Sequence, residues 1–297
     1  MVHNKFKGLG IALITPFKSD GSIDYDALLR LVEYQIKNGA DFLCIMGTTA
    51  ETPCLTKEEK QTLKNLLVER VAGRVPLLMG CGGNNTAAIA DEISHGDWKG
   101  IDGILSVCPF YNKPSQEGLY QHFKTLAKAS PLPLVLYNVP GRTGVNMTAD
   151  TTLRLAHDFE NIVAIKEASG NITQMDDIIK NKPEHFDVIS GDDGITFPLI
   201  TLGAVGVISV IGNALPAEFS RMVRLALNGD YESARTIHHK FAELFKLLFV
   251  DGNPAGVKAM LHAMGMIENQ LRLPLVPTRL TTMEKISAIL KDLDIRY

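Results

Sequence analysis

The chain has 297 residues, of which 45% are hydrophobic and 21% are charged, a mixture typical of a globular protein with a packed core. Its formal net charge is −3, so it lacks the basic excess that binds nucleic acid or an anionic membrane surface. No apolar run approaches the roughly 18 residues that cross a bilayer, and the first ten residues lack the apolar core of a secretory signal. We therefore expect a cytoplasmic protein with neither a nucleic-acid nor a membrane partner.

Cysteine and histidine spacing gives no sign of a metal site. No CxxC pair occurs, and no two histidines have the spacing of zinc ligands. We expect four reduced, structural cysteines, which lie singly in the chain: Cys44, Cys54, Cys81 and Cys108.

Short apolar runs recur along the first 210 residues. Most are rich in Ile, Val and Leu without polar alternation, which is typical of parallel strands covered on both faces. They lie at residues 9–14, 42–46, 75–79, 103–107, 134–137, 162–165, 186–189 and 206–210.

Amphipathic segments between these runs predict helices. The clearest lie at residues 25–38, 58–72, 115–129 and 148–157, and Thr56 with Glu59 forms the pattern of a capping box. Repeated strand–helix units of this number predict an α/β protein with the (β/α)8 TIM barrel fold. A doubly wound open sheet is the alternative, but it normally has a glycine-rich phosphate loop after the first strand, where this chain has Thr-Pro-Phe-Lys.

The strand pattern stops at Pro216, and the remaining segments are helical. They cover residues 217–228, 231–250, 256–264 and 282–293. We predict a catalytic barrel at residues 1–228 and a C-terminal α-helical extension at 229–297. The extension is expected to pack against the barrel or serve in assembly, with no separate function.

One apolar run ends in a lysine, Lys166. A lysine at a strand end is most often solvated or ion-paired, but Tyr137 ends the preceding run one strand–helix unit earlier. The active site of a parallel barrel lies at the carboxyl ends of its strands, so the two side chains should be neighbours there. Strand alternation directs Glu167 to the opposite face, which leaves the amine unpaired.

Other strand ends carry further polar side chains. The second run ends in MGTTAET, which provides the Thr48 and Thr49 hydroxyls and the Glu51 carboxylate. Phe110 and Tyr111 follow the fourth run, where an aromatic side chain more often packs than takes part in chemistry.

An arginine and two aspartates complete the candidate residues. Arg142 follows Tyr137 in a loop, and its guanidinium is suited to a carboxylate, although a surface ion pair is the ordinary alternative. Asp192 and Asp193 follow the seventh run, where they could cap a helix or bind a divalent cation. We favour capping, because no histidine or glutamate at a strand end completes a ligand set.

This set of residues favours Schiff-base chemistry without a cofactor or a metal. Apolar surroundings favour the neutral form of an amine, and a neutral lysine amine can condense with a carbonyl substrate. The protonated imine then promotes loss of a proton from the adjacent carbon, and the resulting enamine attacks an aldehyde.

The motifs GTTAE, YNVPGRTG, IKEASG, SGDD and GVISV resemble those of the dihydrodipicolinate synthase branch of the pyruvate-dependent class I aldolases. The resemblance runs from about Gly8 to the C-terminus and includes FVDGNPAGVKAML. It implies condensation of pyruvate with L-aspartate 4-semialdehyde to give 4-hydroxy-tetrahydrodipicolinate, on the way to diaminopimelate and lysine. It also implies a homotetramer built as a dimer of dimers. The alternative within the fold is another Schiff-base aldolase, acting on a sialic acid or a 2-keto-3-deoxy sugar acid.

The resemblance also implies roles for catalytic residues. Lys166 matches the Schiff-base lysine, and Tyr137 matches the general acid and base. Thr48 matches a proton-relay threonine, and Tyr111 matches a relay tyrosine that neighbouring subunits exchange.

Four further positions match substrate-binding residues of the family. Thr49 and Ile208 match pyruvate contacts, and Gly191 lies near the imine. Arg142 matches the arginine that binds the carboxylate of the semialdehyde. Since sialic-acid lyases lack such an arginine, Arg142 argues against the alternative.

Two departures from the family pattern bear on activity and regulation. Ala50 replaces a glycine, which requires that its φ be negative. In lysine-inhibited relatives, histidines and a glutamate line the feedback site, where this chain has Lys57, Lys60 and Ala88, with Phe110 in place of a second tyrosine. Two cations without a carboxylate should repel the ammonium group of the inhibitor, so we expect weak or absent inhibition by lysine.

Overall fold

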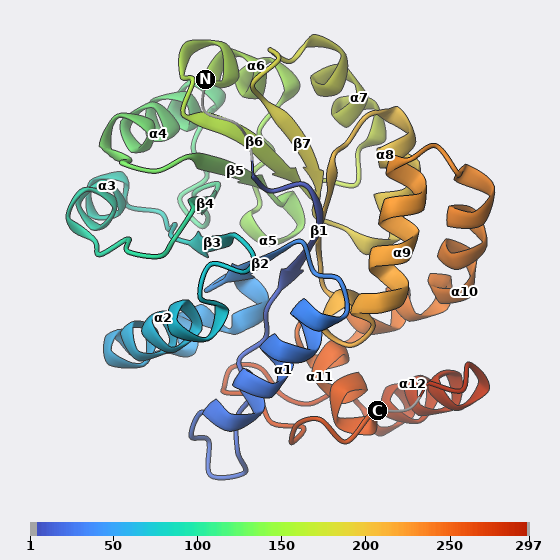
Figure 1. Cartoon of the computed structure of the whole chain (residues 1–297). Coiled ribbons are helices and arrows are strands. Elements are labelled where there is room, and N and C mark those ends of the chain that lie inside the picture. The colour runs from blue at the N-terminus through green and yellow to red at the C-terminus, as the bar shows by residue number, and fades with distance from the viewer. Residues whose placement is uncertain (1–4, 296–297) are drawn as a thin grey trace.

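The computed structural model describes residues 5–295, in which eight parallel strands form a closed barrel in chain order (Figure 1). This confirms the predicted (β/α)8 architecture and excludes the open sheet. The strands are β1 (Gly8–Ala12), β2 (Phe42–Ile45), β3 (Leu77–Gly80), β4 (Gly103–Val107), β5 (Leu134–Asn138), β6 (Ile162–Glu167), β7 (Asp187–Ser190) and β8 (Gly206–Ser209).

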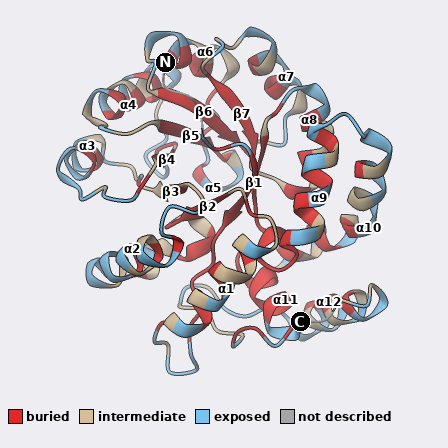
Figure 2. Ribbon diagram, viewed as in Figure 1, coloured by how far each residue is buried: buried red, intermediate tan, exposed pale blue. Residues whose placement is uncertain are grey.

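Nearly all strand residues are buried, as their continuous apolar runs predict, and the half-buried exceptions are Met79 and Gly80 of β3 and Val107 of β4 (Figure 2). One apolar cluster fills the barrel interior and includes Phe42, Leu78 and Val163. A larger cluster fills the layer between the strands and the surrounding helices. All four cysteines are free, and Cys44, Cys81 and Cys108 are buried.

Helices surround the barrel and mostly begin at a side-chain cap. Thr56 and Glu59 form the predicted capping box, and Thr148 accepts from the backbone N–H of Thr151. The helices are α1 (Tyr25–Lys37), α2 (Lys57–Val71), α3 (Thr86–His95), α4 (Gln116–Ala129), α5 (Pro140–Thr143), α6 (Ala149–Asp158), α7 (Ile172–Asn181), α8 (Thr196–Leu202) and α9 (Pro216–Leu227).

Three helices form the predicted extension: α10 (Tyr231–Val250), α11 (Ala255–Ala263) and α12 (Leu280–Asp292). Helix α10 packs against α9, α11 packs against α10, and α12 packs against both α10 and α11 (Figure 1). The boundary between residues 228 and 229 stays a prediction, and the outer ends of both predicted domains, residues 1–4 and 296–297, lie outside the described residues. No helix within residues 5–295 is long and apolar enough to span a membrane.

Candidate active site

Lys166 and Tyr137 meet at the carboxyl ends of β6 and β5. The two residues are paired in the register of these strands, and Lys166 Nζ lies 4.4 Å from the centroid of the Tyr137 ring. Both are buried, with 6% and 7% exposure respectively. The one-unit spacing in the sequence therefore predicts their contact correctly, because adjacent parallel strands place equivalent ends side by side.

The surroundings of the Lys166 side chain leave its amine without a counter-ion. No carboxylate of residues 5–295 forms an ion pair with it. Gly191, just after β7, lies so close that a Cβ there would be 3.1 Å from Lys166 Cε and 2.7 Å from Ala168 Cβ. Inside the barrel, burial raises the pKa of the Cys44 thiol to about 11, so this neighbour is neutral and provides no anion.

Glu167 points to the opposite face of β6, as alternation predicts. Its carboxylate accepts hydrogen bonds from Asn138 Nδ2 at 3.1 Å, Gln174 Nε2 at 3.0 Å and the Ser169 backbone N–H at 2.7 Å. Burial raises its pKa, although these hydrogen bonds oppose the shift. Glu167 thus links the ends of β5 and β6 beneath the Lys166–Tyr137 pair without neutralising the amine.

A residue of the extension reaches the loop that follows β2. Asn253, in the turn before α11, donates a hydrogen bond from Nδ2 to Thr49 Oγ1 at 3.0 Å. Its backbone carbonyl lies 3.5 Å from Nη2 of Arg142, and its own side-chain oxygen is buried without a hydrogen-bond partner in the described structure. Asn253 therefore contacts two predicted substrate-binding residues that belong to different loops.

Asn253 is not among the residues that the sequence patterns predict to be functional. Residues 49 and 253 are separated by most of the chain, so no local pattern predicts their contact. The available signal was the motif FVDGNPAGVKAML, which contains this asparagine.

The loop after β2 corrects one expectation and meets another. The Glu51 carboxylate is completely buried in an ion pair with Lys258 of α11, so it is not an accessible polar group at the strand end. Two residues of this loop have a positive φ, Met46 with φ +53° and Glu51 with φ +54°, and Ala50 is absent from the positive-φ residues of the described chain. The alanine that replaces the family glycine therefore causes no backbone strain.

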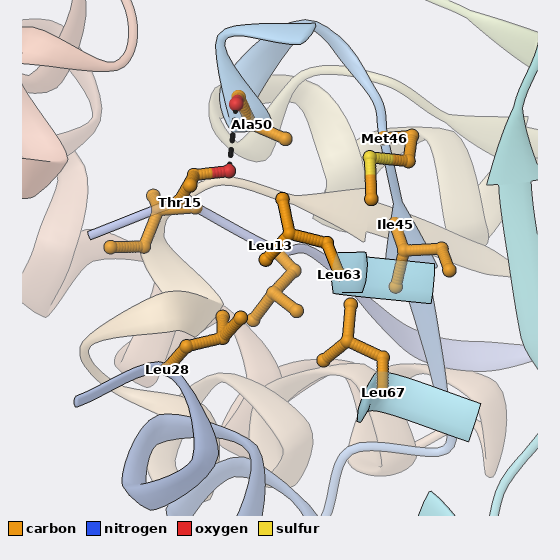
Figure 3. A pocket seen from close by; sticks show the side chains of 9 residues that line it. Leu13, Thr15, Leu28, Ile45, Met46, Ala50, Leu63 and Leu67 are labelled. Atoms are coloured by element: carbon orange, nitrogen blue, oxygen red, sulfur yellow. Dashed lines mark hydrogen bonds between the residues drawn. The ribbon is translucent and has the colours of Figure 1, made fainter. Parts of the chain in front are cut away.

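A small apolar pocket lies under this loop, outside the barrel (Figure 3). It is lined by residues of β2, α1 and α2 and of the segment after β1, including Leu13, Leu28 and Leu67. At one end of the pocket, the Thr15 hydroxyl donates a 2.8 Å hydrogen bond to the Ala50 carbonyl. Because no charged side chain lines this pocket, it does not fit an anionic keto acid.

The remaining predicted residues have different surroundings. Ile208 of β8 belongs to the same interior apolar cluster as Tyr137. Thr48 is partly buried, and no hydrogen bond joins its hydroxyl to Tyr137 in the part of the chain described here. Tyr111 is 89% exposed with φ +69°, so a single chain does not bring it into contact with the Lys166–Tyr137 pair.

The two aspartates after β7 bind backbone amides. Asp192 Oδ1 accepts from the Gly194 N–H at 2.8 Å. Asp193 Oδ2 accepts from the Val210 and Ile211 N–H groups at 3.0 and 2.8 Å, and burial raises its pKa to about 6. Asp192 therefore caps the turn that begins at Asp193, and Asp193 ties that turn to the end of β8.

A closed parallel barrel with a buried, unpaired lysine beside a tyrosine at its carboxyl end defines a barrel enzyme of the class I aldolase type. The model of the dihydrodipicolinate synthetase family matches residues 5–293. The chain belongs to this family.

Individual relatives agree over the full length. The chain is 71% identical over 296 residues to the 4-hydroxy-tetrahydrodipicolinate synthase of Phocaeicola vulgatus, with all of both chains covered. Among solved structures, it is similar to the chloride-inhibited dihydrodipicolinate synthase from Acinetobacter baumannii complexed with pyruvate, at 40% identity, TM-score 0.94 and coverage of 97% and 99% of the two chains. It is also similar to the enzyme from Cyanidioschyzon merolae with lysine bound, at 38% identity, TM-score 0.94 and coverage of 99% and 100%.

Proposed function

We propose that this enzyme condenses pyruvate with L-aspartate 4-semialdehyde through a Schiff base on Lys166, giving 4-hydroxy-tetrahydrodipicolinate for diaminopimelate and lysine biosynthesis. The observation that carries the proposal is the buried Lys166 amine, without a carboxylate partner in the described chain, 4.4 Å from the Tyr137 ring centroid. The 71% identity to a 4-hydroxy-tetrahydrodipicolinate synthase supports the choice of substrates. Arg142 and the family both speak against a sialic-acid or sugar-acid lyase.

The reaction begins when Lys166 Nζ attacks C2 of pyruvate. The carbinolamine loses one water, with Tyr137 as proton donor, and leaves an iminium whose C3 proton is then removed. The enamine carbon bonds to the aldehyde carbon of the semialdehyde, and the new alkoxide takes up a proton to become the 4-hydroxyl. The amino group of the second substrate finally displaces Lys166 from the imine carbon, which closes the ring and frees the lysine.

Two groups of residues support these steps. Thr48, Thr49, Gly191 and Ile208 are proposed to relay protons to Tyr137 or to contact the pyruvate part. Arg142 is proposed to bind the carboxylate of the semialdehyde with its two-pronged guanidinium.

Covalent trapping tests the proposal. The protein is incubated with pyruvate, reduced with borohydride and digested, and the modified peptide is identified by mass spectrometry. We expect one pyruvate-derived adduct, on Lys166, and none in Lys166→Ala. An unmodified protein, or an adduct on another lysine, would overturn the assignment.

We also propose a cytoplasmic homotetramer, a dimer of dimers, in which Tyr111 reaches a neighbouring active site. The support is the high exposure of this large aromatic side chain together with its positive φ. Sedimentation equilibrium should give a tetramer. If Tyr111→Phe then lowers turnover without altering the sedimentation, the tyrosine acts across the interface rather than in assembly.

A further inference from the structure

A completely buried ion pair lies outside the reacting groups and joins the barrel to the extension. The Lys258 ammonium of α11 donates to Glu51 Oε1, and both side chains have 0% exposure. Burial lowers the pKa of Lys258 to about 8, and Glu51 opposes that shift. Because desolvation of two charges offsets much of their attraction, such a pair is weak evidence for a role in stability alone.

Each partner of the pair also holds other groups. Glu51 Oε2 accepts from the Arg272 backbone N–H at 3.0 Å. Lys258 donates to the Gln270 carbonyl at 2.9 Å, and its ammonium lies 4.2 Å from the centroid of the Phe17 ring. The pair thus connects the loops after β1 and β2 with two segments of the extension.

The ion pair holds Glu51 in a backbone conformation that is unfavourable on its own. Glu51 adopts φ +54°, a left-handed conformation that residues other than glycine rarely use. Its N–H bonds to the Thr48 carbonyl at 3.1 Å and so ends the short turn that contains Thr48 and Thr49. Any displacement of Glu51 therefore moves this turn.

The extension holds the same turn at a second point, through the hydrogen bond from Asn253 to the Thr49 hydroxyl. Asn253 and Lys258 are five positions apart, on the turn before α11 and on α11 itself. A shift of α11 relative to the barrel would therefore change both contacts together.

We infer that Glu51 and Lys258 are positioning residues for the reaction, and that their ion pair sets the placement of Thr48 and Thr49 just beyond the carboxyl end of β2. The inference rests on the proposed function. Neither side chain touches the reacting atoms. Both act through the short turn that contains Thr48 and Thr49, which we call the threonine turn. The helical extension then forms part of the catalytic apparatus, in contrast to the sequence-based expectation that it has no separate function.

The decisive variants are Lys258→Met and Glu51→Gln, alone and combined. Each single change leaves one buried group without its charged partner and should lower the thermal midpoint, whereas the double variant leaves no buried charge unpaired and should recover much of it. Catalysis should not recover in parallel. For the double variant we expect the KM for pyruvate to rise about tenfold, with slower borohydride-trapped adduct formation and a semialdehyde KM within about twofold of the wild-type value.

Lys64→Met is the matched control. Lys64 is another buried lysine, with 4% side-chain exposure, and it pairs with Asp97 away from the threonine turn. Its loss should lower the midpoint without raising the KM for pyruvate. If the double variant is unstable, Glu51→Gln, which keeps the side-chain shape, is assayed well below its own midpoint and should show the same selective rise in pyruvate KM.

Two results would overturn the inference. In the first, the double variant, or Glu51→Gln in its place, has a pyruvate KM and a trapping rate within twofold of wild type. In the second, Lys64→Met shows the same rise in pyruvate KM as the double variant. The failure of the proposed function has a different signature. In that case wild-type protein itself gives no adduct on Lys166.

Discussion

The change Arg142→Ala should impair the reaction with the semialdehyde but leave the reaction with pyruvate intact. Arg142 is exposed in α5, and its 3.5 Å contact with the Asn253 carbonyl is longer than a good hydrogen bond. It forms no ion pair within residues 5–295. Its removal should therefore change the free energy of unfolding by no more than about 0.5 kcal/mol.

The expected kinetic effect is larger and falls on one substrate. Hydrogen bonds between a guanidinium and a carboxylate contribute about 1.5–3 kcal/mol, which corresponds to a loss of roughly 10- to 150-fold in kcat/KM for the semialdehyde. Formation of the pyruvate adduct on Lys166 should continue at the wild-type rate, because Arg142 does not contact the Lys166 side chain.

The assay compares borohydride trapping with steady-state turnover at varied semialdehyde. Arg142→Lys is the control, since it retains the charge but loses the paired donors, and it should give an intermediate loss. Equal losses in adduct formation and in semialdehyde turnover, or a large drop in thermal midpoint, would show that Arg142 has a structural role instead.

Three further predictions concern proton transfer, pH and regulation. Tyr137→Phe should lower kcat by about 10²- to 10⁴-fold in turnover assays, as is typical of a general acid–base residue, and a near-normal rate would remove it from the mechanism. Burial lowers the pKa of His122 to about 4, so only the unfolded state gains a proton as the pH falls below about 6.5. The free energy of unfolding therefore decreases by about 3 kcal/mol between that pH and pH 4. In urea titrations, His122→Gln should remove this loss and the exposed His157→Gln should not; equal pH dependence in both would contradict the assignment. L-lysine below about 1 mM should leave steady-state turnover unchanged because of Lys57 and Lys60, and clear inhibition there would refute the prediction.

The sequence predicts the barrel well because each strand is a local apolar run and many helix starts are marked by a cap. The third strand shows the limit of this approach. Its apolar run begins at Val75, but the strand begins at Leu77, after Pro76, which lacks the N–H that pairing requires. The amphipathic patterns do not mark helices α3, α7 and α8, although Asn85 and Asn171 cap the first two.

The contacts of the candidate site are likewise only partly predictable from the sequence. The contact between Tyr137 and Lys166 follows from the order of the strands, so their spacing in the sequence is sufficient to predict it. Asn253 and Lys258 reach Thr49 and Glu51 through tertiary packing that joins positions 204 and 207 residues apart. A lysine within the apolar sequence AGVKAML of α11 was the remaining signal, because a buried ammonium needs a partner.

The contact between Asn253 and Thr49 has a consequence for the order in which the enzyme matures during translation. The barrel strands, with Lys166 and Tyr137, leave the ribosome before α11 and can begin to associate as soon as β8 has emerged. The threonine turn still lacks its contacts from the extension at that stage. If the proposed roles of Lys166 and Thr49 hold, a nascent chain places the amine beside Tyr137 before the proposed pyruvate-binding turn gains its contacts from the extension, and full activity requires the helices that are translated last.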